Sequence, residues 1–148
     1  PMGKATRGQF ACALANAMGY DSSMASETEL RFTDVKDGDY YAGAITFCYD
    51  NGIISGYEDN TFRPKQTITR QEAAAMLNNA FDLTASTDVS KFTDAGKIAS
   101  WATAHVGAVA NAELMNGDAA GTFRPTGTLT RAELASILMN ANIHGFID

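Results

Sequence analysis

One stretch of the chain occurs twice, and this repetition constrains the fold more than any other feature. Residues 53–76 read IISGYEDNTFRPKQTITRQEAAAM, and residues 114–137 read LMNGDAAGTFRPTGTLTRAELASI. The Thr-Phe-Arg-Pro step and the Thr-Arg pair both recur at an offset of 61 residues, and a shorter version with Thr6-Arg7 opens the chain. A repeat of this length has room for two helices and their connections. The chain is therefore expected to be an array of similar units that share one core.

The repeat divides the 148 residues into units of unequal completeness. Residues 1–20 correspond to the second half of a first repeat, residues 32–83 to a complete second repeat, and residues 92–142 to a complete third repeat. Residues 143–148 are either a tail or the start of a further unit, because they contain another Phe-x-Asp sequence. Pro1 aligns with the proline of the Phe-Arg-Pro step, so we expect the chain to be a piece of a longer protein.

Each complete repeat predicts two helices, which makes the expected fold class mainly α. The first helix of repeat two is expected over Tyr40–Asn51, where apolar side chains form a broad face, and Gly52 ends it. The second helix begins at a capping box formed by Thr69 and Glu72. The same pattern recurs at Thr130…Glu133 and, with glutamine, at Thr6…Gln9. Three such helices with apolar stripes are expected to pack around a shared axis.

Composition and the absence of certain motifs argue against several classes of function. The net charge of −6 argues against a nucleic-acid-binding surface, which needs a basic stripe. No apolar run reaches the roughly 18 residues that span a bilayer, so membrane insertion is not expected. No Gly-x-Ser-x-Gly, Walker or metal-ligand pattern occurs, and the sequence predicts no metal, no cofactor and no enzyme activity. Cys12 and Cys48 lie in apolar helical patterns, where buried free thiols are favoured over a disulfide.

An arginine at the first position of each capped helix is not explained by capping. Arg7, Arg70 and Arg131 all follow the cap residue, although a cation there opposes the positive end of the helix dipole. Two interpretations stay open, and they are compatible. The arginine pairs with an acidic residue of a neighbouring repeat, or it binds an anionic ligand beside the free N–H groups of the helix start.

Three further pairs of repeated residues are candidates for a binding site. They are Gly56 with Gly117, Arg63 with Arg124, and Tyr40 with Trp101. The glycines indicate a positive φ angle or a close backbone approach, for which turn geometry alone is the simpler explanation. The arginines of the Phe-Arg-Pro steps fit a structural role and a ligand-binding role equally. The aromatic residues stand at equivalent helix starts, where a ring can stack on a sugar, although core packing is the commoner use.

Several landmarks together resemble the S-layer homology repeat, and the resemblance covers nearly the whole chain. They are Phe32-x-Asp34-Val35, Gly52-Ile53-Ile54-x-Gly56-Tyr57, Thr61-Phe62-Arg63-Pro64 and the Thr-Arg-x-Glu helix start. The Thr-Arg-Ala-Glu motif of the family matches residues 130–133 fully, residues 69–72 with one change and residues 6–9 with two. The resemblance implies tandem two-helix repeats that form a pseudo-threefold spindle with a central three-helix bundle.

The resemblance also implies a function. Members of the family bind secondary cell-wall polymer in grooves between repeats, often through a sugar that bears a pyruvate ketal. The chain would then be an exported, non-covalent anchor at the cell surface, with bacterial cell-wall polysaccharide as its partner and cargo domains linked covalently in the parent protein. The implied ligand-binding residues are Arg7, Arg70, Arg131, Gly56, Gly117, Tyr40, Trp101, Arg63 and Arg124.

The two complete repeats differ at one position that bears on this function. Asp118 occupies the place of Tyr57, and its negative charge is unfavourable near an anionic ligand. The groove supplied by repeat two is therefore expected to bind better than the groove supplied by repeat three. The alternative function is structural self-assembly or protein docking without glycan binding.

Overall fold

The computed structural model describes residues 3–25 and 31–148, so the alignment of Pro1 concerns a residue outside these ranges. The described elements are α1 (Arg7–Ala17), η1 (Ser22–Ala25), α2 (Ala42–Asp50), α3 (Arg70–Phe81), η2 (Ala95–Lys97), η3 (Ser100–Ala102), α4 (Thr103–Asn111) and α5 (Arg131–Ile143). In these ranges β structure is limited to isolated bridges, and no helix is long and apolar enough to cross a membrane. The mainly-α fold class is confirmed.

Capping boxes start the three helices that were expected to share an axis. In α3, the hydroxyl of Thr69 accepts a hydrogen bond from the backbone N–H of Glu72, and the Glu72 carboxylate accepts one from the backbone N–H of Thr69. The same reciprocal pair opens α1 and α5, with Gln9 in place of glutamate in α1. Each cap satisfies two backbone donors that a helix start leaves free, which explains why these boundaries were predictable.

A closed ring of backbone hydrogen bonds joins the segments that precede α1, α3 and α5. The N–H of Ala5 donates to the carbonyl of Leu129 at 2.8 Å, that of Leu129 to Ile68 at 2.9 Å, and that of Ile68 to Ala5 at 3.0 Å. All three side chains are fully buried. The ring relates the three helix starts by an approximate threefold arrangement, which fits a central bundle; the spindle outline of the whole module stays a prediction.

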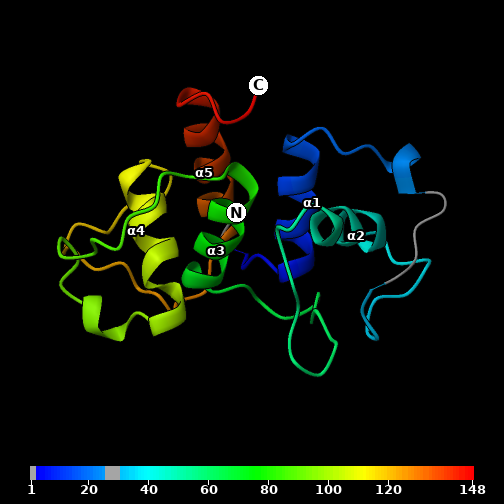
Figure 1. Ribbon diagram of the computed structural model, residues 1–148, viewed down its shortest axis with the longest axis horizontal. Helices are drawn as coiled ribbons and strands as arrows, with labels where there is room; N and C mark the ends of the chain where they lie inside the picture. The colour runs from blue at the N-terminus through cyan, green and yellow to red at the C-terminus, as the bar shows by residue number, and fades with distance from the viewer. Residues whose placement is uncertain (1–2, 26–30) are drawn as a thin grey trace.

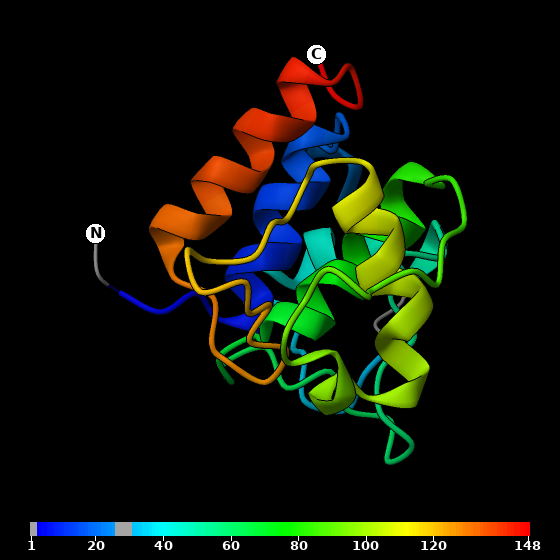
Figure 2. The ribbon, with the colours of Figure 1, turned by 90° about the vertical axis from the view of Figure 1, so that its left-hand side faces the viewer.

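The remaining helices pack on the outside of this arrangement. Figure 1 shows α2 against α1 and α4 against α3, on opposite sides of the molecule, and Figure 2 shows α5 beside α1. The core beneath them includes Phe32, Phe62, Phe92 and Phe123, all at most 5% exposed. At the far end of the bundle, Phe146 stacks on Phe81 of α3 with ring centroids 5.6 Å apart. The last residues therefore cover the ends of the central helices.

The cysteines and the glycine that ends α2 also follow the prediction. Cys12 and Cys48 are both free as expected, but Cys12 is only partly buried, whereas Cys48 is buried and its pKa is raised to about 12 by burial. Gly52 has a φ angle of +74°, and its counterpart after α4, Glu113, has a φ angle of +61°. A side chain at a positive φ angle is strained, so repeat three carries a local cost that repeat two avoids.

This difference predicts opposite effects of two substitutions. Glu113→Gly should raise the free energy of unfolding by about 0.5 to 1 kcal/mol, because relief of the strained φ outweighs the extra freedom of glycine in the unfolded chain. Gly52→Ala should lower it by about 1 kcal/mol, since an added Cβ meets no atom within 4 Å and only the φ angle is unfavourable. Urea denaturation would measure both changes. A Glu113→Gly variant less stable than the native chain would contradict the explanation.

Candidate functional site

Two pockets lie at equivalent places in the structure, each between a central helix and the loop that follows an outer helix. The Arg7 pocket has a volume of about 260 Å³, and the Arg70 pocket has a volume of about 240 Å³. Equivalent positions of the repeats line the two pockets: Arg7 and Arg70, Ile53 and Leu114, Ile54 and Met115, Ser55 and Asn116, Glu72 and Glu133, Ala75 and Ser136, Met76 and Ile137, and Asn79 and Asn140. The repeat thus builds the same pocket twice, with the arginine supplied by the preceding unit.

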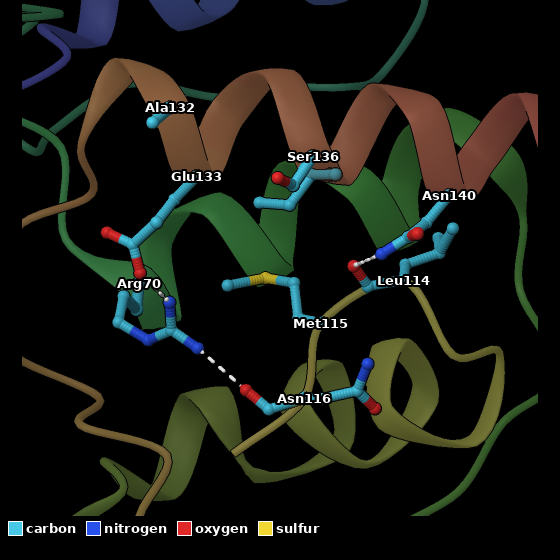
Figure 3. A pocket seen from close by; sticks show the side chains of 9 residues that line it. Arg70, Leu114, Met115, Asn116, Ala132, Glu133, Ser136 and Asn140 are labelled. Atoms are coloured by element: carbon cyan, nitrogen blue, oxygen red, sulfur yellow. Dashed lines mark hydrogen bonds and ion pairs between the residues drawn. The ribbon is translucent and has the colours of Figure 1, made fainter. Parts of the chain in front are cut away.

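Arg70 is buried at the edge of its pocket and held by three groups. Its Nη1 donates to the carboxylate of Glu133 at 2.7 Å and its Nη2 to the carbonyl of Asn116 at 2.9 Å (Figure 3). Its Nε donates to the carbonyl of Phe123 at 2.6 Å. Burial lowers the pKa of Arg70 from its ordinary value, yet the guanidinium stays charged at neutral pH. The guanidinium group of Arg70 is therefore fixed in one orientation before any ligand binds.

Glu133 is the acidic partner in this pair. Burial alone would raise the pKa of Glu133, but the hydrogen bond from the backbone of Thr130 and the charge of Arg70 outweigh burial and hold the pKa below its usual value. Arg124 also contacts the same carboxylate oxygen at 3.2 Å. The carboxylate is consequently ionised throughout the neutral range, and it balances one of the two arginine charges.

Arg7 repeats the arrangement in the other pocket. Its Nε donates to the carbonyl of Phe62 at 2.9 Å, and its Nη1 lies 3.1 Å from the carboxylate of Glu72. The guanidinium also lies over the ring of Tyr57, at 4.9 Å from the centroid, and the Tyr57 hydroxyl donates to Glu72. Pairing with an acidic residue of the next repeat, one of the two open interpretations, is confirmed for Arg7 and Arg70. Ligand binding by these residues stays a prediction.

The third helix-start arginine has a different environment. Arg131 is exposed, and a Cβ atom added at Gly3 would come within 2.5 Å of its Nη2. Its backbone N–H donates to the carbonyl of Gly3 at 2.9 Å, which matches the backbone contact of the other two arginines. Arg131 lines neither the Arg7 pocket nor the Arg70 pocket.

Internal packing explains both repeated glycines. Gly56 has a φ angle of +80°, and a Cβ atom there would overlap the ring of Phe32. At Gly117 a Cβ atom would lie 3.1 Å from the ring of Phe92 and 3.0 Å from the carbonyl of Thr122. The close approach is therefore to a core phenylalanine of the same repeat, and Gly56 lines the Arg7 pocket as a consequence of that packing.

A carboxylate fixes the two arginines of the Phe-Arg-Pro steps in an unusual backbone conformation. Asp34 accepts hydrogen bonds from the backbone N–H groups of Phe62 and Arg63, at 2.9 and 2.7 Å, and Asp94 does the same in repeat three. Arg63 and Arg124 have φ angles of +61° and +58°. An arginine in this region costs more than a glycine would, which indicates that the side chain is used.

The two arginines use their side chains differently. The guanidinium of Arg63 lies 3.7 Å from the ring centroid of Tyr57, whereas Arg124 contacts Asp118 at 3.7 Å and Glu133 at 3.2 Å. Arg63 therefore contacts Tyr57, which lines the Arg7 pocket. Arg124 contacts Glu133, which lines the Arg70 pocket, and Asp118, which stands at the position of Tyr57. Arg63 also lies 3.6 Å from Asp59, so both arginines have acidic partners, and the repeats differ in the ring of Tyr57 on which Arg63 stacks.

The aromatic candidates separate in space. Trp101 is 55% exposed, lies in η3 just before α4 and lines the Arg7 pocket. Tyr40 is 71% exposed, contacts the ring of Tyr41 and lies outside both pockets. Trp101 thus reaches the pocket from repeat three, while the other wall comes from repeats one and two.

The sequence analysis missed the polar residues of the helix faces. Asn79 donates to the carbonyl of Ile53 at 3.2 Å, and Asn140 donates to that of Leu114 at 3.4 Å. Both asparagines recur at the offset of the repeat, seven positions after the capping-box glutamate and on the same helix face. That periodicity was the signal that could have found them.

Comparison with known proteins identifies the class to which this fold and these pockets belong. The profile of the S-layer homology domain matches residues 31–74 and 91–135. The chain belongs to the S-layer homology family, as its motifs predicted.

Similar proteins share the module within much longer chains. The chain is 32% identical to a surface-layer 125 kDa protein of Lysinibacillus sphaericus over 140 residues, which is 93% of this chain and 12% of that protein. It is 29% identical over 144 residues to a cellulosome-anchoring protein of Acetivibrio thermocellus, covering 93% of this chain and 32% of that protein. A match to the exoglucanase XynX of the same species, 37% identical, covers 72% of this chain and only 10% of the enzyme.

These relationships confirm the predicted kind of module. The family and these relatives support a surface-anchoring role, and the enzyme shares only a small part of its length with this chain. The chain spans at most about a third of these three relatives, so similarity extends to the module and not to the rest of those proteins.

The Arg70–Glu133 pair predicts a pH-dependent contribution to stability. Glu133→Gln should lower the free energy of unfolding by about 1 to 2 kcal/mol at pH 7, because Arg70 loses its charged partner. Gln9 shows that glutamine supports the capping box. The pKa of Glu133 is lowered by folding, so the difference should be full above its ordinary value of 4.5 and should disappear as pH falls further.

Chemical denaturation at a series of pH values would measure this difference. Glu58→Gln is the matched control, because Glu58 is exposed in a loop and its substitution removes the same charge. Equal stability of the Glu133→Gln and Glu58→Gln variants at pH 7 would show that the pair contributes nothing.

Proposed function

We propose that this module holds its parent protein on the bacterial cell wall by binding a pyruvylated secondary cell-wall polymer in the Arg7 and Arg70 pockets. One observation carries the proposal: two pockets between repeats each contain a buried, pre-oriented arginine at a helix start. The rest of the parent protein is then the anchored cargo. The short share of the similar proteins that the module covers supports this division.

The chemistry of the pockets suits a carboxylate carried on a sugar. Of the five N–H donors of a guanidinium, Arg70 uses three on protein groups, so two stay available. Apolar side chains such as Met115 form part of the wall, and Asn116, Ser136 and Asn140 supply polar groups (Figure 3). This mixture matches the apolar faces and hydroxyl edges of a pyranose ring. The volumes lie just below about 300 Å³, the lower end for small-molecule sites, which favours a single terminal sugar in each.

The two pockets should differ in affinity. The Arg7 pocket has Tyr57 and Trp101, which add aromatic surface, and no acidic residue at the position of Asp118. Near the Arg70 pocket, Asp118 and Glu133 share Arg124 and reduce the local positive charge. The Arg7 pocket is therefore the stronger site for an anionic sugar. Arg7 and Gly56 line it, and Arg63 contacts its Tyr57. Arg70 lines the weaker one, and Arg124 contacts its Glu133.

Trp101 offers a test that spares the fold, because its side chain is largely exposed. Trp101→Ala should weaken binding to isolated wall carrying the pyruvylated polymer by about tenfold, since stacking on a sugar face is lost. Met139→Ala is the matched control: Met139 is 64% exposed on α5 and lines neither pocket. Co-sedimentation would measure the affinities. Trp101 is the chain's single tryptophan, so its fluorescence would also report ligand entry.

The same assay decides between glycan binding and the alternative. Wall whose pyruvate ketals have been removed by mild acid should retain little of the module. Equal retention by intact and treated wall would overturn the proposal. Concentration-dependent oligomers that do not respond to wall fragments would favour self-assembly or docking instead.

A further inference from the structure

A third pocket is lined in part by Arg63, whose guanidinium contacts the ring of Tyr57 in the Arg7 pocket. It has a volume of about 470 Å³ and is called here the Lys36–Lys65 pocket. Its charged lining residues are Lys36, Lys65, Arg63, Asp34 and Asp39. None of the functions considered so far uses it.

The two carboxylates of this pocket accept hydrogen bonds from backbone N–H groups. Both oxygens of Asp34 accept hydrogen bonds, from the N–H groups of Phe62 and Arg63. Asp39 accepts one from the N–H of Lys36 at 2.8 Å. The ammonium groups of Lys36 and Lys65, in contrast, make no hydrogen bond or ion pair with any residue in the described ranges. In a chain with a net charge of −6, this pocket has three cations against two carboxylates, and one of the cations, Arg63, also lies 3.6 Å from Asp59.

Arg63 connects this pocket to the Arg7 pocket. Its guanidinium lies 3.7 Å from the ring centroid of Tyr57, and Tyr57 lines the Arg7 pocket. Asp34 holds the backbone of Arg63 at a φ angle of +61°, which keeps the side chain over that ring. The stacked pair therefore joins a lining residue of one pocket to a lining residue of the other, so the two pockets are neighbours.

The lysine after the Phe-Arg-Pro step is not a requirement of the repeat fold. Lys65 corresponds to Thr126 in repeat three, where the same turn forms without a cation. Both lysines of the pocket are exposed, so neither contributes to the core. Tyr40, 71% exposed, stands next to this pocket with its ring 4.8 Å from that of the lining residue Tyr41. An exposed ring beside unpaired cations is a combination that suits an acidic glycan.

We propose that the Lys36–Lys65 pocket binds a second anionic group of the wall polymer, a carboxylate or a phosphodiester on a sugar close to the one in the Arg7 pocket. The proposal rests on the proposed function and extends it from a terminal sugar to a longer segment. Tyr40 then provides a stacking surface at the outer edge of the segment. The module would then bind best to a polymer whose two negative charges are spaced to reach both pockets.

The test compares two double variants of equal charge. Lys36→Gln/Lys65→Gln should bind purified pyruvylated wall polymer about tenfold more weakly than the native chain at low salt, because two charge contacts are lost. Its affinity for a single pyruvylated methyl hexoside should stay within twofold of the native value. Lys91→Gln/Lys97→Gln removes two exposed lysines outside the three pockets and should leave both affinities unchanged. Isothermal titration calorimetry would measure all of them.

Each outcome decides one proposal. Equal polymer affinity of the two double variants overturns the second anion site, whatever the monosaccharide does. Failure of the native chain to bind the pyruvylated monosaccharide overturns the pyruvate assignment of the Arg7 pocket, while a difference between the double variants on polymer still supports the second site. If the native chain binds neither probe, both proposals are overturned.

A chemical treatment of the polymer identifies the group. Carbodiimide amidation neutralises carboxylates and leaves phosphodiesters charged. Amidation also neutralises the pyruvate carboxylate, so the affinity should fall for every variant, and the measured quantity is the ratio of the affinities of the two double variants. An unchanged ratio assigns the second group to a phosphodiester, and a ratio of one assigns it to a carboxylate.

Discussion

The ring of backbone hydrogen bonds among Ala5, Ile68 and Leu129 is the constraint on which the rest of the structure depends. Each segment donates to one neighbour and accepts from the other, so removal of any one leaves an unpaired donor and an unpaired acceptor in the core. The ring brings three capped helix starts together. The arginine that follows each cap therefore lies close to a different repeat. Arg7 and Arg70 contact the capping-box glutamates of the next repeat, Glu72 and Glu133.

That geometry explains how an acidic chain can present anion sites. Arg7 and Arg70 are buried, and burial of an unpaired cation would be costly, so a glutamate compensates each of them. The glutamate serves the helix cap and the arginine at once. The pair fixes the guanidinium in place and leaves donors free, which reduces the ordering that a ligand would have to supply. Stability and ligand recognition are thus built from the same contacts.

The two complete repeats show how one scaffold supports sites of different strength. The aspartate of the Phe-x-Asp motif holds the backbone of Arg63 and Arg124 in the same left-handed conformation. One residue then changes the outcome, because Tyr57 offers a ring for a cation to stack on, while Asp118 offers a charge for it to pair with. The unpaired lysines near repeat two extend the difference.

The sequence alone determined the repeats, the helix starts, the mainly-α class and the family, because these depend on short-range signals. A threonine three residues before a glutamate, directly before an apolar helical pattern, marks a helix start, and internal alignment reveals the period. Only the tertiary structure decided that Arg70 pairs with Glu133, 63 positions away, and that Phe32 rather than a ligand requires Gly56. It also decided that Trp101 reaches a pocket and Tyr40 does not. These facts follow from which surfaces of different repeats meet, and no local pattern encodes that.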